Sequence, residues 1–274
     1  MNVKYQKLKD ILQEMGNMLA AFSGGVDSTF LLKAAKDVLG DHLLAVTALS
    51  DTTPRQERDE AVRLAEMLGV AHIIVESEEM NLPEFVKNTP DRCYICKKQR
   101  YSEMLKIAGE KGFAYLADGE NYDDREDYRP GTRAAKELGV RSPLREAGLT
   151  KSDIRMISKE LNLPTWNKPA FPCLASRIPY NSPITPEKLR QTDAGEIFLR
   201  EIGMDPQLRV RHYGDTVCIE LKAEDIAKLA DDTLRIRIVN YFKSIGFDFV
   251  TLDLEGYARG SLNKRFIRSA EIAF

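Results

Sequence analysis

The chain has 274 residues, 43% of them hydrophobic and 30% charged, a composition typical of a folded globular protein with one large or two modest domains. The 40 Lys and Arg residues nearly balance the 42 Asp and Glu residues, and a net charge of −2 argues against a broad nucleic-acid surface. No apolar run reaches membrane-spanning length, and the first residues lack the apolar core of a signal peptide. We therefore expect a cytoplasmic protein with no nucleic-acid or membrane partner.

The stretch 20–29 predicts a phosphate-binding loop. A helical run over 8–19 leads into a short buried strand at 20–22, then two adjacent glycines, then a helix over 28–38. Such a unit directs backbone N–H groups and the positive end of a helix dipole at one point, which suits a phosphate. An ordinary Gly-Gly turn is the alternative. The residues expected to bind nucleotide phosphates are Ser23, Gly24, Gly25, Asp27 and Ser28, with Asp27 also a ligand of magnesium.

Further buried strands are predicted at 43–48, 72–75 and 113–117, with a helix over 55–68 between the first two. This alternation predicts an α/β fold with a doubly wound parallel sheet, whose ligands bind at the carboxyl ends of the strands. We expect the adenosine of a nucleotide at Ala48 and Ser50, and the loop at Gly119 to face the phosphates. Asp124 in that acidic loop could share magnesium with Asp27, although acidic loops are often simply solvated.

Two of the four cysteines form a Cys-x-x-Cys pair. Cys93 and Cys96 stand at the entry to a helix predicted over 97–111, and their spacing suits a metal or cluster ligand pair or a redox disulfide. Zinc would favour a second such pair, and the chain has none, so an iron–sulfur site with three cysteine ligands is arithmetically possible. The alternative is a pair of buried thiols at a helix start.

Cys173 lies in a proline-rich segment, 166–179, that predicts a stiff functional loop. Prolines restrict the loop at little folding cost, and the cations of Lys168 and Arg177 on either side favour a thiolate. A rigid connector between domains, with a buried thiol, is the alternative.

A change of pattern after residue 182 predicts two domains, 1–182 and 183–274. The second is expected to be a small α+β domain, with a helix over 186–202, a hairpin of 208–212 with 217–221, helices over 223–230 and 232–245, and a strand at 247–252. Arg209 and Arg211 share one strand face and suit a phosphate or carboxylate, or else form a solvated face.

Several motifs occur in order along nearly the whole chain. They are the loop at 23–28, Asp118-Gly-x-Asn-x-Asp-Asp, Arg129-Pro-Gly, Arg141-Ser-Pro-Leu, Cys173-Leu-Ala-Ser-Arg, Arg209-Val-Arg and Asp253-Leu-Glu-Gly-Tyr. Together these motifs resemble the LarE family, whose members are PP-loop ATP pyrophosphatases that act as ATP-dependent sulfur transferases in nickel-pincer cofactor synthesis. Glu120 and Ala258 depart from the family pattern.

The resemblance implies that ATP adenylates the carboxylates of pyridinium-3,5-biscarboxylic acid mononucleotide and that sulfur then gives thiocarboxylates. It implies catalytic roles for Asp27, Lys98 and Cys173, and a homo-oligomer, since proteins of this family form hexamers. Sulfur comes either from Cys173 itself, which becomes dehydroalanine, or from a 4Fe–4S cluster on Cys93, Cys96 and Cys173, which the three cysteines favour. The substrate is expected to bind to Ser176 and Arg177 of the first domain. In the small domain it is expected to bind to Glu196, Arg209, Arg211 and Glu220, and this domain is also expected to support oligomerisation.

Three other functions are compatible with a PP-loop. A tRNA-thiolating enzyme is disfavoured by the near-neutral charge. An amide-forming ligase of the NAD- or GMP-synthetase kind would leave the three cysteines without a role. A nucleotide sensor would bind ATP without releasing pyrophosphate.

Overall fold

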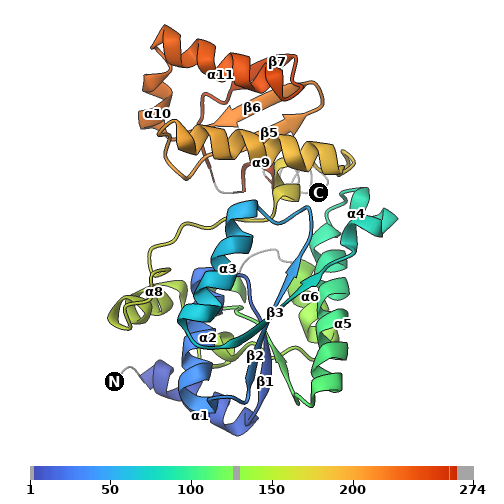
Figure 1. The fold of residues 1–274 in the computed structure, drawn as a ribbon, viewed down its shortest axis with the longest axis vertical. Helices are drawn as coiled ribbons and strands as arrows, with labels where there is room; N and C mark the ends of the chain where they lie inside the picture. The colour runs from blue at the N-terminus through green and yellow to red at the C-terminus, as the bar shows by residue number, and fades with distance from the viewer. Residues whose placement is uncertain (1–2, 126–129, 259, 264–274) are drawn as a thin grey trace, which may run out of the picture. The chain divides into compact units, whose positions relative to one another are not determined.

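A parallel sheet of four strands, in the order β3-β2-β1-β4, organises the first part of the chain in this computed structural model (Figure 1). The predicted α/β class with a doubly wound parallel sheet is confirmed. All of β2 is buried, as a parallel strand covered on both faces requires. The strands are β1 (Met18–Ala21), β2 (Leu43–Leu49), β3 (Ala71–Glu76) and β4 (Leu116–Ala117).

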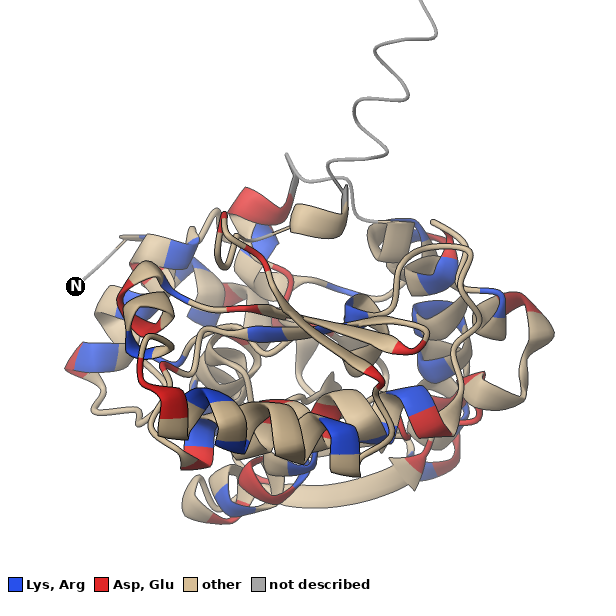
Figure 2. Cartoon of the chain, turned by 90° about the horizontal axis from the view of Figure 1, so that it is seen from above, with Lys and Arg blue, Asp and Glu red and all other residues tan. Residues whose placement is uncertain are grey.

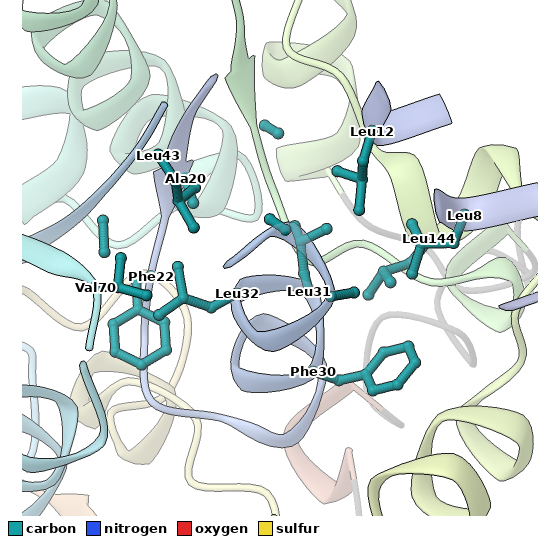
Figure 3. Close-up of a cluster of buried hydrophobic side chains, with 14 of the residues drawn as sticks. Leu8, Leu12, Ala20, Phe22, Phe30, Leu31, Leu32, Leu43, Val70 and Leu144 are labelled. Carbon is teal, nitrogen blue, oxygen red and sulfur yellow. The ribbon is translucent and has the colours of Figure 1, made fainter. Parts of the chain in front are cut away.

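Helices pack on both faces of this sheet, and each face has its own apolar core. Alternate residues of β1 point to opposite faces, so Ala20 belongs to one core and Leu19 to the other. Figure 3 shows Leu31 and Leu32 of the helix Val26–Leu39 within the core that contains Ala20, called the first core here. Helices α1 (Val3–Met15), α2 (Val26–Leu39), α3 (Arg55–Met67), α7 (Pro143–Glu146) and α8 (Lys151–Glu160) contribute to that core, whereas α5 (Arg92–Lys111) and α6 (Pro130–Glu137) contribute to the second; α4 (Pro83–Val86) is a short turn of helix.

Three predicted boundaries are wrong. The first helix ends at Met15 rather than continuing to residue 19, because Gly16 takes a φ of 70° and the strand then begins at Met18. The helix that carries Cys93 and Cys96 begins at Arg92, not at residue 97. The fourth strand is shorter than 113–117, because β4 pairs with β1 only at Leu116 and Ala117.

The second part of the chain forms a three-stranded sheet in the order β5-β6-β7. The predicted hairpin is confirmed, since β5 pairs antiparallel with β6, and β7 adds in parallel. Val210, Val217 and Ile219 point into a core with the helices, while Arg209, Arg211 and Glu220 alternate with them. The elements are α9 (Pro186–Glu201), β5 (Arg209–Tyr213), β6 (Thr216–Glu220), α10 (Ala223–Lys228), α11 (Asp232–Ser244) and β7 (Phe249–Leu252).

The structure describes residues 3–125, 130–258 and 260–263, so Arg129 of the sequence motifs lies outside the described residues. The chain divides into two compact units: unit 1 comprises Met1–Val86 and Pro90–Phe171, and unit 2 comprises Lys87–Thr89 and Pro172–Phe274. The second unit therefore starts before residue 183. Two contacts explain this: Arg177 binds Glu196 of α9, and the Asn88 amide donates to the carbonyls of Ile178, Pro179 and Ser182. In the described ranges, no helix has the length and apolar character needed to span a membrane.

Two helical glycines differ in the space around them and give a matched pair of variants. A Cβ on Gly195 of α9 would lie 2.6 Å from the Phe242 ring, whereas a Cβ on Gly109 of α5 would meet nothing within 4 Å. We expect Gly195→Ala to lower the free energy of unfolding by about 1–3 kcal/mol through overpacking. Gly109→Ala should raise it by about 0.5–1 kcal/mol. Urea unfolding of both variants checks this, and a stabilised Gly195→Ala would contradict it.

Candidate active site

The loop between β1 and α2 has the geometry of an anion-binding turn. Gly24 takes a φ of 69°, and Gly25 caps α2 without a side-chain hydrogen bond to the first helical turn. The first N–H groups of α2 therefore receive no acceptor from the cap residue and are suited to a phosphate. The Oγ atoms of Ser23 and Ser28 are 3.1 Å apart, so both hydroxyls of the motif face one point.

Two glycines allow other segments to approach this loop closely. A Cβ on Gly119 would lie 3.0 Å from the backbone nitrogen of Ser28, so the loop after β4 rests on the start of α2. A Cβ on Gly24 would lie 3.3 Å from the Cα of Ala61 in α3. Next to Gly119, the buried Glu120 accepts hydrogen bonds from Thr132 and Arg145. The residue that departs from the family pattern thus ties the β4 loop to α6 and α7.

Asp27 has a carboxylate with one oxygen paired and one without a partner. Its Oδ2 accepts from the Lys151 ammonium at 2.7 Å and from the Asn121 amide at 3.3 Å. Its Oδ1 is buried and has no hydrogen bond among the described residues. A buried carboxylate oxygen without a donor is suited to a cation, so Asp27 fits a magnesium ligand.

Asp124 lies in the same loop as Asn121 but is used differently. Its Oδ2 accepts from the backbone N–H of Asn121. Within the part of the chain that the structure describes, no group of three or more His, Cys, Asp or Glu side chains is placed to hold a metal ion. A magnesium ion shared by Asp27 and Asp124 stays a prediction.

At the nucleotide edge of the sheet, Ser50 belongs to a polar network around Glu79. Ala48 is buried at the end of β2, and the Ser50 hydroxyl donates to Glu79 Oε1 at 2.5 Å. The Arg100 guanidinium of α5 also donates to Glu79, at 2.6 Å, and to the hydroxyls of Ser50 and Thr52. Burial raises the pKa of Glu79, but Arg100 and the hydroxyl donors outweigh it, so the pKa lies below its ordinary value. The network fixes α5 to the loop after β2.

Cys93 and Cys96 lie in the first two turns of α5, Cys93 exposed and Cys96 half-buried. Lys98, expected to be catalytic, lies on the exposed side of this helix, where its ammonium donates to the Tyr94 hydroxyl at 2.8 Å and is 3.5 Å from Glu137. The lysine that the structure brings to the phosphate loop is Lys168, which donates to the Gly24 carbonyl at 3.1 Å. The catalytic role of Lys98 stays a prediction without a contact to support it.

Within unit 2, three arginines and two glutamates form a buried charge cluster. Arg177 donates twice to Glu196, at 2.8 Å each, and Arg211 donates twice to Glu220, at 2.8 and 2.7 Å. Burial, followed by repulsion from Arg177, lowers the pKa of Arg209 to about 10. Arg209 donates to the Leu208 carbonyl at 2.6 Å and to the Tyr257 hydroxyl at 3.4 Å. A bound anion near it would raise its pKa again.

Arg177 also fixes the backbone of the cysteine loop. Its Nη1 donates to the carbonyls of Pro172 and Cys173, at 2.5 and 3.1 Å, and to the Ser176 hydroxyl at 3.0 Å. The Ser176 carbonyl in turn accepts from Arg211 at 2.9 Å. The structure therefore brings Ser176, Arg177, Glu196, Arg211 and Glu220 together, with the Cys173 thiol exposed beside them.

Sequence reasoning missed two contacts of the site. Lys151, which pairs with Asp27, directly follows the N-cap residue Thr150, and no spacing rule distinguishes it from a solvated lysine. Arg100 and Glu79 come from segments with no motif, although Arg100 follows Cys96 at helical i,i+4 spacing, which could have placed both on one face.

Comparisons with known proteins match both parts of the chain. A family model described as asparagine synthase matches residues 8–98, which include the phosphate loop. A pyridinium-3,5-bisthiocarboxylic acid mononucleotide synthase of Lactiplantibacillus plantarum is 38% identical over 96% of this chain and 95% of its own. An uncharacterized protein of Synechocystis sp. is 44% identical over 95% of this chain and 97% of its own. A tRNA-specific 2-thiouridylase of Caulobacter vibrioides is 24% identical over 75% of this chain and 63% of its own.

The parallel sheet and its glycine loop define an enzyme of the PP-loop class, which uses ATP. The alignment of this chain with the mononucleotide synthase also covers the cysteine loop and the second unit. The chain belongs to the LarE family of ATP-dependent sulfur transferases.

Replacing Asp27 tests its role as the magnesium ligand. Asp27→Asn should slow magnesium-dependent pyrophosphate release by roughly 100-fold, because an amide is a poorer ligand than a carboxylate. Asp37→Asn, on the exposed side of the same helix, is the control, because Asp37 pairs only with Lys33 in the described contacts. Pyrophosphate release at the wild-type rate by Asp27→Asn would remove Asp27 from the metal site.

Proposed function

We propose that the protein adenylates the carboxylates of pyridinium-3,5-biscarboxylic acid mononucleotide and converts them to thiocarboxylates for nickel-pincer cofactor synthesis. The observation that carries the proposal is Arg177, which holds the backbone of the Cys173 loop while pairing with Glu196. Glu196 also accepts from the backbone N–H of Val210, between Arg209 and Arg211. One buried ion pair thus joins the Cys173 loop to the strand proposed to bind the substrate phosphate, and this supports sulfur transfer to a phosphorylated substrate.

The first step takes place at the PP-loop. A substrate carboxylate oxygen attacks the α-phosphorus of ATP, and pyrophosphate leaves with the electrons of the broken P–O bond. The N–H groups at the start of α2, with Ser23 and Ser28, bind the phosphates, and Asp27 holds magnesium beside them. Adenylation turns the carboxylate oxygen into part of AMP, a good leaving group.

In the second step a sulfur nucleophile forms a C–S bond at the acyl carbon, and AMP leaves. Cys93 and Cys173 are exposed and Cys96 is half-buried, so none of the three residues is enclosed in a core, which supports a role as cluster ligands. A 4Fe–4S cluster held by these three thiolates would keep one iron without a protein ligand and supply a sulfide there. Cys93 and Cys96 belong to unit 1 and Cys173 to unit 2, and their convergence is part of the proposal.

Two alternatives make different predictions. If Cys173 itself donates sulfur, its thiolate forms a thioester with the acyl group. The Cβ–S bond then breaks as the Cα proton leaves to a base, giving the thiocarboxylate and dehydroalanine. A tRNA substrate would favour a basic face, whereas Figure 2 shows Lys and Arg interspersed with Asp and Glu along the described helices.

We also propose that the protein is a cytoplasmic homo-oligomer, on its resemblance to the family.

Removing the two arginines of β5 tests substrate recognition. Arg209→Ala with Arg211→Ala should raise the KM for the mononucleotide by roughly 100-fold, because a charge-assisted hydrogen bond contributes about 1.5–3 kcal/mol. ATP affinity should be unchanged. Arg235→Ala, an exposed arginine of α11, is the control. Arg209→Ala alone keeps the Arg211–Glu220 pair, so it provides the measurement if the double variant does not fold. Equal loss of ATP affinity would assign these arginines to the nucleotide.

Iron content and the fate of residue 173 identify the sulfur source. We expect anaerobically purified protein to contain iron and acid-labile sulfide and to keep Cys173 intact after turnover. Cys93→Ala or Cys96→Ala should abolish thiocarboxylate formation, whereas Cys218→Ala, which alters the fourth cysteine, should not. Mass spectrometry of the protein and the product provides both readouts. Dehydroalanine at residue 173, with no iron bound, would rule out the cluster.

A further inference from the structure

Lys168 lies where three segments of unit 1 meet. Its ammonium donates to the Gly24 carbonyl of the PP-loop at 3.1 Å, and it is 2.9 Å from Glu57 and 2.8 Å from Glu60, both in α3. Only 9% of its side chain is exposed. Because the protein's own oxygens surround this ammonium, it is suited to holding segments together rather than to binding a ligand.

The backbone around Lys168 is fixed from the other side by α8. The Arg155 guanidinium donates to the carbonyls of Trp166 and Lys168, at 2.8 Å each. The backbone N–H of Lys168 also donates to the Thr165 carbonyl at 3.0 Å. Residues 165–168 are therefore anchored to α8 by Arg155 and to the PP-loop by Lys168.

The chain between Lys168 and Cys173 is short and stiff. Only Pro169, Ala170, Phe171 and Pro172 separate them. Even in a fully extended chain, the distance between the Cα atoms of Lys168 and Cys173 therefore cannot exceed about 18 Å. Both prolines fix their own φ and restrict the residues before them, which reduces the freedom of the segment further. A displacement of Lys168 would therefore pass to the cysteine loop.

We propose that Lys168 is a positioning residue for sulfur transfer, tying the segment that leads into Cys173 to the PP-loop where the adenylate forms. The inference rests on the proposed function, in which Cys173 holds or donates the sulfur. Lys168 acts on the second step, because its ammonium is occupied by protein oxygens and the phosphates have the N–H groups of α2. Looser placement of a reacting group by about 1 Å can cost roughly 100-fold in rate.

Lys168→Met should uncouple the two steps. We expect pyrophosphate release with the mononucleotide to stay within about threefold of wild type, and thiocarboxylate formed per pyrophosphate to fall at least about tenfold. Lys168→Arg, which keeps the charge, should restore most of the ratio. Lys159→Met is the matched control, because Lys159 contacts Trp166 of the same segment without reaching the PP-loop. A fall of both products by one common factor, or no change in either, overturns the proposal.

Two further measurements cover the ways in which this test could mislead. Lys168→Met leaves Glu57 and Glu60 without their shared cation, so the variant is repeated with Glu57→Gln and Glu60→Gln, and the uncoupling should persist. Amide hydrogen exchange over residues 170–176, without nucleotide or substrate, does not depend on the reaction. It should be at least about tenfold faster in Lys168→Met and unchanged in Lys159→Met. Unchanged amide exchange in Lys168→Met would overturn the proposal that Lys168 holds the segment leading into Cys173. If the wild-type protein forms no thiocarboxylate, only the proposed function is overturned.

Discussion

The close approach of Gly119 to the start of α2 sets the arrangement of the nucleotide site. A Cβ on Gly119 would lie 3.0 Å from the Ser28 nitrogen, so any other residue would require the β4 loop and the helix to separate by a few tenths of an ångström. That loop carries Asn121, whose amide reaches Asp27. The backbone of one strand end thus sets the position of a side chain on its neighbour, and the parallel sheet places both at the same edge.

Around this contact, the site is fixed by charges that the protein pairs before any ligand binds. Asp27 forms an ion pair with Lys151, Glu79 with Arg100, and Lys168 with both Glu57 and Glu60. In unit 2, Arg177–Glu196 and Arg211–Glu220 serve in the same way. Apart from Asp27–Lys151, whose lysine side chain is 39% exposed, these pairs are largely buried. Buried pairs add little net stability relative to apolar side chains, but breaking one is costly, so they hold groups in a single arrangement. Among the described residues, Asp27 Oδ1 is a buried oxygen without a hydrogen bond, and a bound cation would pair it.

The sequence predicted the parts of the molecule that depend on local pattern. The strand, glycine turn and helix around Ser23 follow from residue spacing, and the hairpin around Gly214 follows from period-two alternation. Lys151 on Asp27 and Arg100 on Glu79 could not be predicted, because each pair joins segments that only the folded sheet brings together. Lys98 was expected to be catalytic on the family resemblance alone, and its ammonium lies 3.5 Å from Glu137, so its role stays a prediction. Gly16 ends the first helix early because one positive φ outweighs the apolar pattern after it.

Residues 87–89 belong to unit 2 although the chain on both sides belongs to unit 1. Asn88 is fully buried there, with its amide donating to three carbonyls of the segment around Pro179. The two units are therefore not separable by a single cut, since division at residue 171 would take those carbonyls from Asn88. A single crossover at residue 171 would therefore exchange Pro172–Phe274 without Lys87–Thr89, the segment that its carbonyls bind.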